Sequence, residues 1–185
     1  MRAKNSAKLN TILLMLIFQI SCAYNFTGLL KPAKDGDLKA IKEILINGSD
    51  INEQDENGVT ALMIATGYNQ TEVVSFLIQN GADVNVRDRD GNTALRYALL
   101  KDNTEMLSLL VQNGADVNLK NSLGKTVLFY AVDRDNVKIV SLLLKSGADV
   151  NVIDTKGKTA LFYAKTRSQM AVSHLLSQYG ARVEF

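Results

Sequence analysis

The sequence predicts an all-α fold, a solenoid of stacked helix-turn-helix units joined by short hairpin-like turns. The chain has no Trp, 6% aromatic residues and a single Pro, which does not favour a β-sandwich rich in Pro and Gly turns. Two glycine series repeat every 33 residues, and such a period is typical of a stack of supersecondary units. They are Gly58, Gly91, Gly124 and Gly157, and then Gly48, Gly81, Gly114, Gly147 and Gly180.

Residues 55–87 form one complete unit, whose elements recur in the units that follow. Residues 55–58 (Asp-Glu-Asn-Gly) have the residue types of a type I turn. Thr60 then N-caps a first helix of about nine residues, because its hydroxyl can accept a hydrogen bond from a free helical N–H. Apolar residues on one face mark a second helix over 72–79, which Gly81 ends in a left-handed conformation. Asn85 is expected to bond to its own local backbone.

Helices this short are unstable alone, so each unit must cover its apolar face with the next unit. The two ends of the stack therefore need polar residues. At the start these are Lys31, Lys34, Lys39 and Lys42. At the end, Lys165 and Ser173 occupy places that are apolar or Thr in the other units, which predicts a closing cap. The expected units span about 28–54, 55–87, 88–120, 121–153 and 154–185.

Two short motifs recur in phase with the glycines. One is Thr-Ala-Leu at 60–62, repeated at 93–95 and 159–161 and as Thr-Val-Leu at 126–128; the other is Gly-Ala-Asp-Val-Asn at 81–85, 114–118 and 147–151. The pattern resembles the ankyrin repeat over residues 28–185. In the family's Thr-Pro-Leu-His motif, Pro is replaced here and His becomes Met63, Arg96, Phe129 or Phe162. Tyr97, Tyr130 and Tyr163 follow at the next position and are expected to pack between stacked helices.

Residues 1–23 have the order of a secretory signal. A basic stretch with no acidic residue precedes an apolar run of about ten residues and the small residues Ser21, Cys22 and Ala23. Cleavage is expected after Ala23, leaving residues 24–185 as the ankyrin-repeat domain. Residues 19–22 also resemble a bacterial lipobox, in which Cys22 would be lipidated. The run is short for a transmembrane anchor, so we expect an exported protein, periplasmic, envelope-anchored or secreted.

The residue inventory excludes several kinds of chemistry. Residues 1–23 hold three basic groups and no acidic one, so the mature chain has 18 Lys+Arg against 19 Asp+Glu and no overall basic charge. One cysteine, Cys22, and one histidine, His174, cannot form an internal disulfide or a usual zinc site. The carboxylates fall mainly at turn positions, and His174 has no Ser or Cys partner. We therefore expect no enzyme activity, no cofactor and no metal.

The resemblance implies that a partner binds the concave face, lined by the hairpin tips and the exposed side of the first helices. Its basic residues outnumber its acidic ones, Glu56, Asp90 and Asp133, by nine to three. The face would therefore attract an acidic protein, with four apolar residues as anchors. The predicted partner-binding residues are Tyr68, Arg87, Arg89, Leu100, Lys101, Lys120, Leu123, Lys125, Arg134, Ile153, Lys156, Lys158 and Arg167.

The preferred prediction is a protein-binding module that is a monomer. Four alternatives to it remain. The chain could be a lipid-tethered spacer in the envelope or a secreted effector directed at a host. An enzyme lacks a catalytic constellation in the sequence. A nucleic-acid binder is suggested by the basic face alone, and the export signal argues against it.

Overall fold

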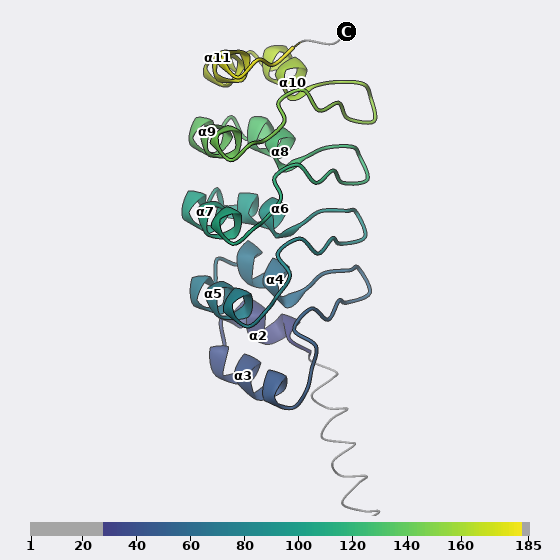
Figure 1. Cartoon of the computed structure of the whole chain (residues 1–185), viewed down its shortest axis with the longest axis vertical. Coiled ribbons are helices and arrows are strands. Elements are labelled where there is room, and N and C mark those ends of the chain that lie inside the picture. Colours follow the sequence, from purple (N-terminus) through teal and green to yellow (C-terminus); the bar gives the residue numbers. More distant parts are fainter. Residues whose placement is uncertain (1–27, 183–185) are drawn as a thin grey trace, which may run out of the picture.

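The computed structural model describes residues 28–182, and the helices in this part of the chain form the predicted all-α solenoid. Figure 1 shows five layers of paired helices, with a row of loops projecting on one side. The first helices of the layers are α2 (Leu30–Asp35), α4 (Ala61–Gly67), α6 (Ala94–Ala98), α8 (Val127–Asp133) and α10 (Ala160–Thr166). The second helices are α3 (Leu38–Ile46), α5 (Thr71–Gln79), α7 (Thr104–Gln112), α9 (Val137–Lys145) and α11 (Met170–Gln178).

The first helices begin as the sequence predicts but are shorter. Thr60 Oγ1 accepts a hydrogen bond from the N–H of Met63 at 3.3 Å, which confirms the N-cap of α4. This helix has seven residues instead of the expected nine. The chain leaves it through Asn69, which has a left-handed backbone (φ 64°). In the third layer, α6 is shorter still and continues as one 3₁₀ turn, η1 (Leu99–Lys101).

The second helices are nine residues long, and side chains or glycine mark their ends. Asn103 and Asn136 accept hydrogen bonds from the N–H groups of Met106 and Ile139, so they cap α7 and α9. Gly81 follows α5 with φ 91°, which confirms the predicted left-handed conformation.

The hydrophobic core is continuous along the stack. Buried apolar residues recur every 33 positions, so each layer repeats the contacts of the one below it. The first helices contribute Leu62, Leu95, Leu128 and Leu161, and the second helices contribute Leu77, Leu110, Leu143 and Leu176. Each of these side chains is at most 2% exposed. This burial stabilises helices that are too short to persist alone.

The structure also confirms the predicted polar residues at the two ends of the stack. Lys165 is exposed, whereas Thr66, Leu99 and Val132 at the same place in the other layers are buried. Ser173 is half-buried where its apolar counterparts are fully buried. At the other end, the four predicted lysines of α2 and α3 are exposed. Because a lysine ammonium is costly to bury, the last unit cannot accept another layer without loss.

The expectation that Asn85 bonds to its own local backbone is wrong. Its Oδ1 accepts from the N–H of Asp116 at 2.8 Å, and its Nδ2 donates to the carbonyl of Gly114 at 3.0 Å. Both partners belong to the next unit. Asn118 and Asn151 repeat this pair of bonds, and Asn52 accepts from the N–H of Asp83. A ladder of asparagines therefore joins successive units.

The predicted signal, with Cys22 and Ala23, lies outside the described residues. Between residues 28 and 182, no helix has the length and apolarity needed to cross a membrane.

Candidate partner-binding surface

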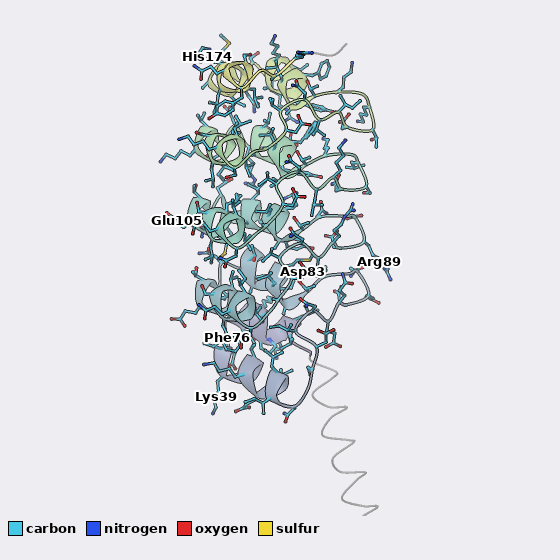
Figure 2. The ribbon with its side chains drawn as sticks, in the orientation of Figure 1. Lys39, Phe76, Asp83, Arg89, Glu105 and His174 are labelled. Carbon is cyan, nitrogen blue, oxygen red and sulfur yellow. The ribbon has the colours of Figure 1, made fainter. Side chains whose placement is uncertain are left out.

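The projecting loops form a row of linked hairpins. Within two of the hairpins an isolated antiparallel bridge pairs Gln54 with Thr60 and Ile153 with Thr159. Successive tips are joined by single backbone hydrogen bonds. These run from the N–H of Arg89 to the carbonyl of Asn57 (2.8 Å), from Ser122 to Asp90 (2.8 Å) and from Thr155 to Leu123 (3.0 Å). The tips therefore make one edge of fixed spacing, with Arg89 at its outer margin (Figure 2).

Glycine allows the hairpins to approach one another this closely. A Cβ on Gly58, Gly91 or Gly124 would lie about 3.0 Å from backbone atoms of the following hairpin. These glycines also have a left-handed backbone, with φ of 77°, 78° and 71°. Gly157, in the last hairpin, has φ 70°, but among the described residues no atom beyond its chain neighbours would lie within 4 Å of a Cβ placed there. Three of the turn glycines thus meet a packing requirement besides the conformational one.

The turn residue at the start of each hairpin organises it from within. Asp55 Oδ1 accepts from the N–H groups of Asn57 and Val59, both at 2.8 Å. Asp154 and Asn121 make the equivalent pair of bonds in their own hairpins. These turn side chains are therefore occupied by the fold, as the sequence predicts.

Tyr97, Tyr130 and Tyr163 pack against the core and also form hydrogen bonds with the turn residues. The phenol O–H of Tyr97 donates to Asp88 Oδ2 at 3.0 Å, and that of Tyr163 donates to Asp154 Oδ2 at 2.6 Å. In the unit between them, Tyr130 Oη accepts from Asn121 Nδ2 at 2.6 Å. The sequence analysis predicted the packing and missed these hydrogen bonds.

The carboxylates shift the acid–base properties of their tyrosines. Burial, together with the bond to Asp88, raises the pKa of Tyr97 well above its ordinary value. The bond to Asp154, with burial, raises the pKa of Tyr163 to about 12. Burial opposes ionisation of Asp154, but hydrogen bonds from Tyr163 and from the N–H groups of Lys158 and Lys156 outweigh it and lower its pKa. These groups stabilise the turns of their hairpins.

The four predicted apolar anchors are all exposed. Leu123 and Ile153 lie on the hairpins and are 52% and 44% exposed. Tyr68 and Leu100 lie at the ends of first helices and are 49% and 47% exposed. Large apolar side chains in such positions are available for contact with another molecule.

The nine predicted basic residues divide into two groups. Five are held by neighbours. Arg134 forms an ion pair with Asp102 at 3.0 Å, Arg167 pairs with Asp133, and Arg87 Nη2 donates to the carbonyl of Lys120 at 2.5 Å. The half-buried Lys125 and Lys158 place their ammonium groups 4.6 Å and 4.5 Å from the ring centroids of Tyr163 and Phe162. The other four, Arg89, Lys101, Lys120 and Lys156, have exposed side chains.

The sequence analysis missed two acidic residues of this surface. Asp102 and Asp135 directly follow Lys101 and Arg134, and both have left-handed backbone, with φ of 50° and 54°. Both are exposed. Including them lowers the excess of basic over acidic residues on this face from six to four. Both belong to a series spaced by 33 residues that begins at Asn69, and this series could have revealed the position.

A hollow at the start of the stack was also missed. It has a volume of about 530 Å³ and lies between α3 and α5, where Leu45, Ile46, Ile51 and Phe76 line it. Ile46 is 83% exposed. At the rim of the hollow, the Lys42 ammonium lies 5.2 Å from the centroid of the Phe76 ring. The polar first unit predicted from its lysines therefore also exposes apolar surface.

The structure also shows where the single histidine lies and how the possible metal ligands are spaced. His174 lies exposed on α11 at the end of the stack, with Gln178 Nε2 3.1 Å from its Nε2 (Figure 2). Within residues 28–182, no three His, Cys, Asp or Glu residues are placed to hold a metal ion.

The linked hairpins and stacked helix pairs define a helical repeat protein, a class that presents an extended surface to its partners. A family model described as ankyrin repeats (3 copies) matches residues 29–121 and 113–185, and the chain belongs to the ankyrin repeat family. No curated protein matches the chain. Ankyrin repeats are protein–protein interaction modules and are typically not enzymes.

Proposed function

We propose that this chain is an exported, non-catalytic interaction module that binds an acidic protein partner through its concave face. One observation carries the proposal. Four exposed apolar side chains lie among exposed basic residues on the hairpins and first-helix ends, in a chain whose mature form has no net positive charge.

The physical basis is a separation of charge. A positive surface steers an acidic partner toward itself and makes association sensitive to salt. Once it is docked, the exposed apolar residues supply the burial that holds it. The ion pairs of Arg134 and Arg167 reduce their share of this steering, so Arg89, Lys101, Lys120 and Lys156 carry most of it.

The export part of the proposal rests on residues 1–23. We propose cleavage after Ala23, or lipidation of Cys22 with anchoring in the envelope, and a monomeric mature protein. Mass measurement of the protein isolated from its source cells distinguishes these forms. A chain beginning at Tyr24 supports cleavage, a lipidated Cys22 supports the anchor, and an intact Met1 contradicts export.

Binding is tested by affinity capture with C-terminally tagged full chain, produced in its source organism. In the test variant, Arg89, Lys101, Lys120 and Lys156 are changed to Glu. A matched control carries the same four-charge reversal on second helices, at Lys39, Lys42, Lys138 and Lys145, which are all exposed. We expect an acidic partner that is captured by the unmodified chain and the control and lost from the test variant.

Other outcomes would contradict the proposal or favour one of the alternatives. Capture of the same partner by the test variant would place the site elsewhere on the molecule. No partner under any condition would favour the spacer, and a partner present only in host extracts would favour the effector. Turnover of a hydrolase substrate by the pure protein would contradict the non-catalytic role.

A further inference from the structure

Charge is unevenly distributed along the hairpin row. The first hairpin segment, 52–59, carries Glu53, Asp55 and Glu56 and no basic residue. The second, 85–92, has two basic and two acidic residues. The third, 118–125, has two lysines and no acid, and the fourth, 151–158, has two lysines and one acid. The edge is therefore negative at one end and positive at the other.

The single acidic side chain of the positive end is buried and hydrogen-bonded within its own hairpin. Asp154 is 6% exposed, and its oxygens accept hydrogen bonds from Tyr163, Lys156 and Lys158. Its carboxylate is thus directed into the turn. The exposed charge of these two hairpins comes from their lysines.

The two positive hairpins also combine charge with apolar surface. The 33-residue register places Lys120 beside Ile153, Leu123 beside Lys156, and Lys125 beside Lys158. The backbone bond from Thr155 to Leu123 holds the two tips together. We call these six residues the 120–158 patch. In the two preceding hairpins the same positions hold Gln54, Asn57 and Val59, and then Arg87, Asp90 and Asn92.

We propose that the 120–158 patch is the primary docking site, and that its occupant is an extended acidic segment of another protein that carries apolar side chains. This inference rests on the proposed function and narrows it to two hairpins. The lysines attract the carboxylates, while Leu123 and Ile153 receive the apolar side chains. The acidic hairpin 52–59 repels the same segment and so confines it to the far end of the row.

Lys125 and Lys158 are suited to a binding role because their positions are partly fixed. Each ammonium already lies over an aromatic ring, at 4.6 Å from the Tyr163 centroid and 4.5 Å from that of Phe162. Their ordering therefore costs less on binding than that of a free lysine side chain. Lys120 and Lys156 flank them with exposed charge.

The test uses the full chain and an array of synthetic peptides about twelve residues long, which span about 40 Å when extended. One set mixes Glu and Asp with Leu, Ile, Val and Phe. A second replaces the acids by Lys, and a third replaces the apolar residues by Ser. We expect binding to the first set, weakened by salt. The affinity of the best peptide is then measured by fluorescence polarisation.

Matched variants locate the site. Lys120→Glu with Lys156→Glu should weaken binding by about tenfold or more, whereas Arg89→Glu with Lys101→Glu, of equal charge change but outside the patch, should weaken it by about two- to threefold. Leu123→Ser with Ile153→Ser should weaken it about fivefold, and Ile46→Ser with Met170→Ser, at exposed apolar residues outside the concave face, should not. If the glutamate variants do not fold, judged by circular dichroism, Gln replaces Glu in both pairs.

Each contrary outcome has a distinct meaning. Equal weakening by the two charge variants would overturn the patch and leave acidic binding by the concave face standing. Failure of every acidic peptide would overturn both proposals. A dimer in sedimentation that dissociates in Lys120→Glu with Lys156→Glu would identify a second copy of this chain as the occupant. That result would overturn the proposed separate partner.

Discussion

Tyr163 and Asp154 are nine residues apart, and the phenol of the first donates a 2.6 Å hydrogen bond to the carboxylate of the second. The bond ties the first helix of the last unit to the hairpin that precedes it. Tyr97 and Asp88 are joined in the same way at 3.0 Å. These pairs act within a unit, so they help each hairpin hold its shape before the next unit packs on it.

Tyr163→Phe should lower the free energy of unfolding at neutral pH by about 1 kcal/mol, because a hydrogen bond to a charged group is lost. Tyr68→Phe is the control, since this ring is 49% exposed at the end of α4. Urea unfolding followed by circular dichroism measures both. Equal effects of the two substitutions would contradict the role of the Asp154 bond.

The same pair predicts the pH dependence of stability. The pKa of Tyr163 rises from 10.0 to about 12 on folding, so its contribution is complete below pH 10 and is lost as the pH rises to 12. The pKa of Asp154 is lowered, so its contribution is present above about pH 4 and is lost in stronger acid. The difference in unfolding free energy between the native chain and Tyr163→Phe should shrink in both directions.

Gly124→Ala should destabilise the protein more than Gly157→Ala, by about 1 to 2 kcal/mol. Both sites have left-handed backbone, so the conformational cost is shared. At Gly124 alone the new methyl group also meets the backbone of Asp154 and Thr155 at 3.0 to 3.2 Å. The comparison is made by urea unfolding, and equal losses would show that the hairpins yield without cost.

Asn118→Ala should cost about 1 to 2 kcal/mol, since it removes two bonds to the next unit, to the N–H of Asp149 and the carbonyl of Gly147. Asn118→Asp keeps the acceptor and should cost less. The control is Asn113→Ala, whose amide bonds only to Leu109 within its own unit. Hydrogen exchange should quicken at the Asp149 amide in Asn118→Ala and stay unchanged in the control.

Lys165→Leu should leave the fold intact and promote end-to-end association, because it replaces the charged residue of the cap by an apolar one. Lys145→Leu, at an exposed end of α9, is the control. Sedimentation at rising concentration should reveal larger species of the first variant alone. Association of both to the same degree would contradict a capping role for Lys165.

The period of 33 residues was sufficient to predict the fold. It places Leu62, Leu95, Leu128 and Leu161 at one position of successive units, and equivalent positions of a stack must lie in line. It also predicted the caps, because Lys165 breaks an otherwise buried series. Helix length was less predictable, since the left-handed position that follows α4 is occupied by Asn69 and not by a glycine.

The 33-residue period does not predict side-chain contacts. A repeat gives the register of Asn85 but not which unit its amide faces, and the bond to Asp116 crosses to the next one. The exposed acids Asp102 and Asp135 were missed for a different reason, because they lie one residue beyond the first-helix positions that were counted. The positions of the apolar residues at the surface were predictable, because Leu123 and Ile153 fall where the fold leaves no core to receive them.

The bonds between hairpin tips have a mechanical consequence. The three junctions on that edge each contain a backbone hydrogen bond of 2.8 to 3.0 Å, and at each of them a turn glycine leaves no compressible side chain between the tips. The opposite edge is made of second helices that pack through side chains. Under tension or torque, the stack will therefore bend about the hairpin edge. The second helices will move apart first, and the spacing between the hairpin tips will stay unchanged.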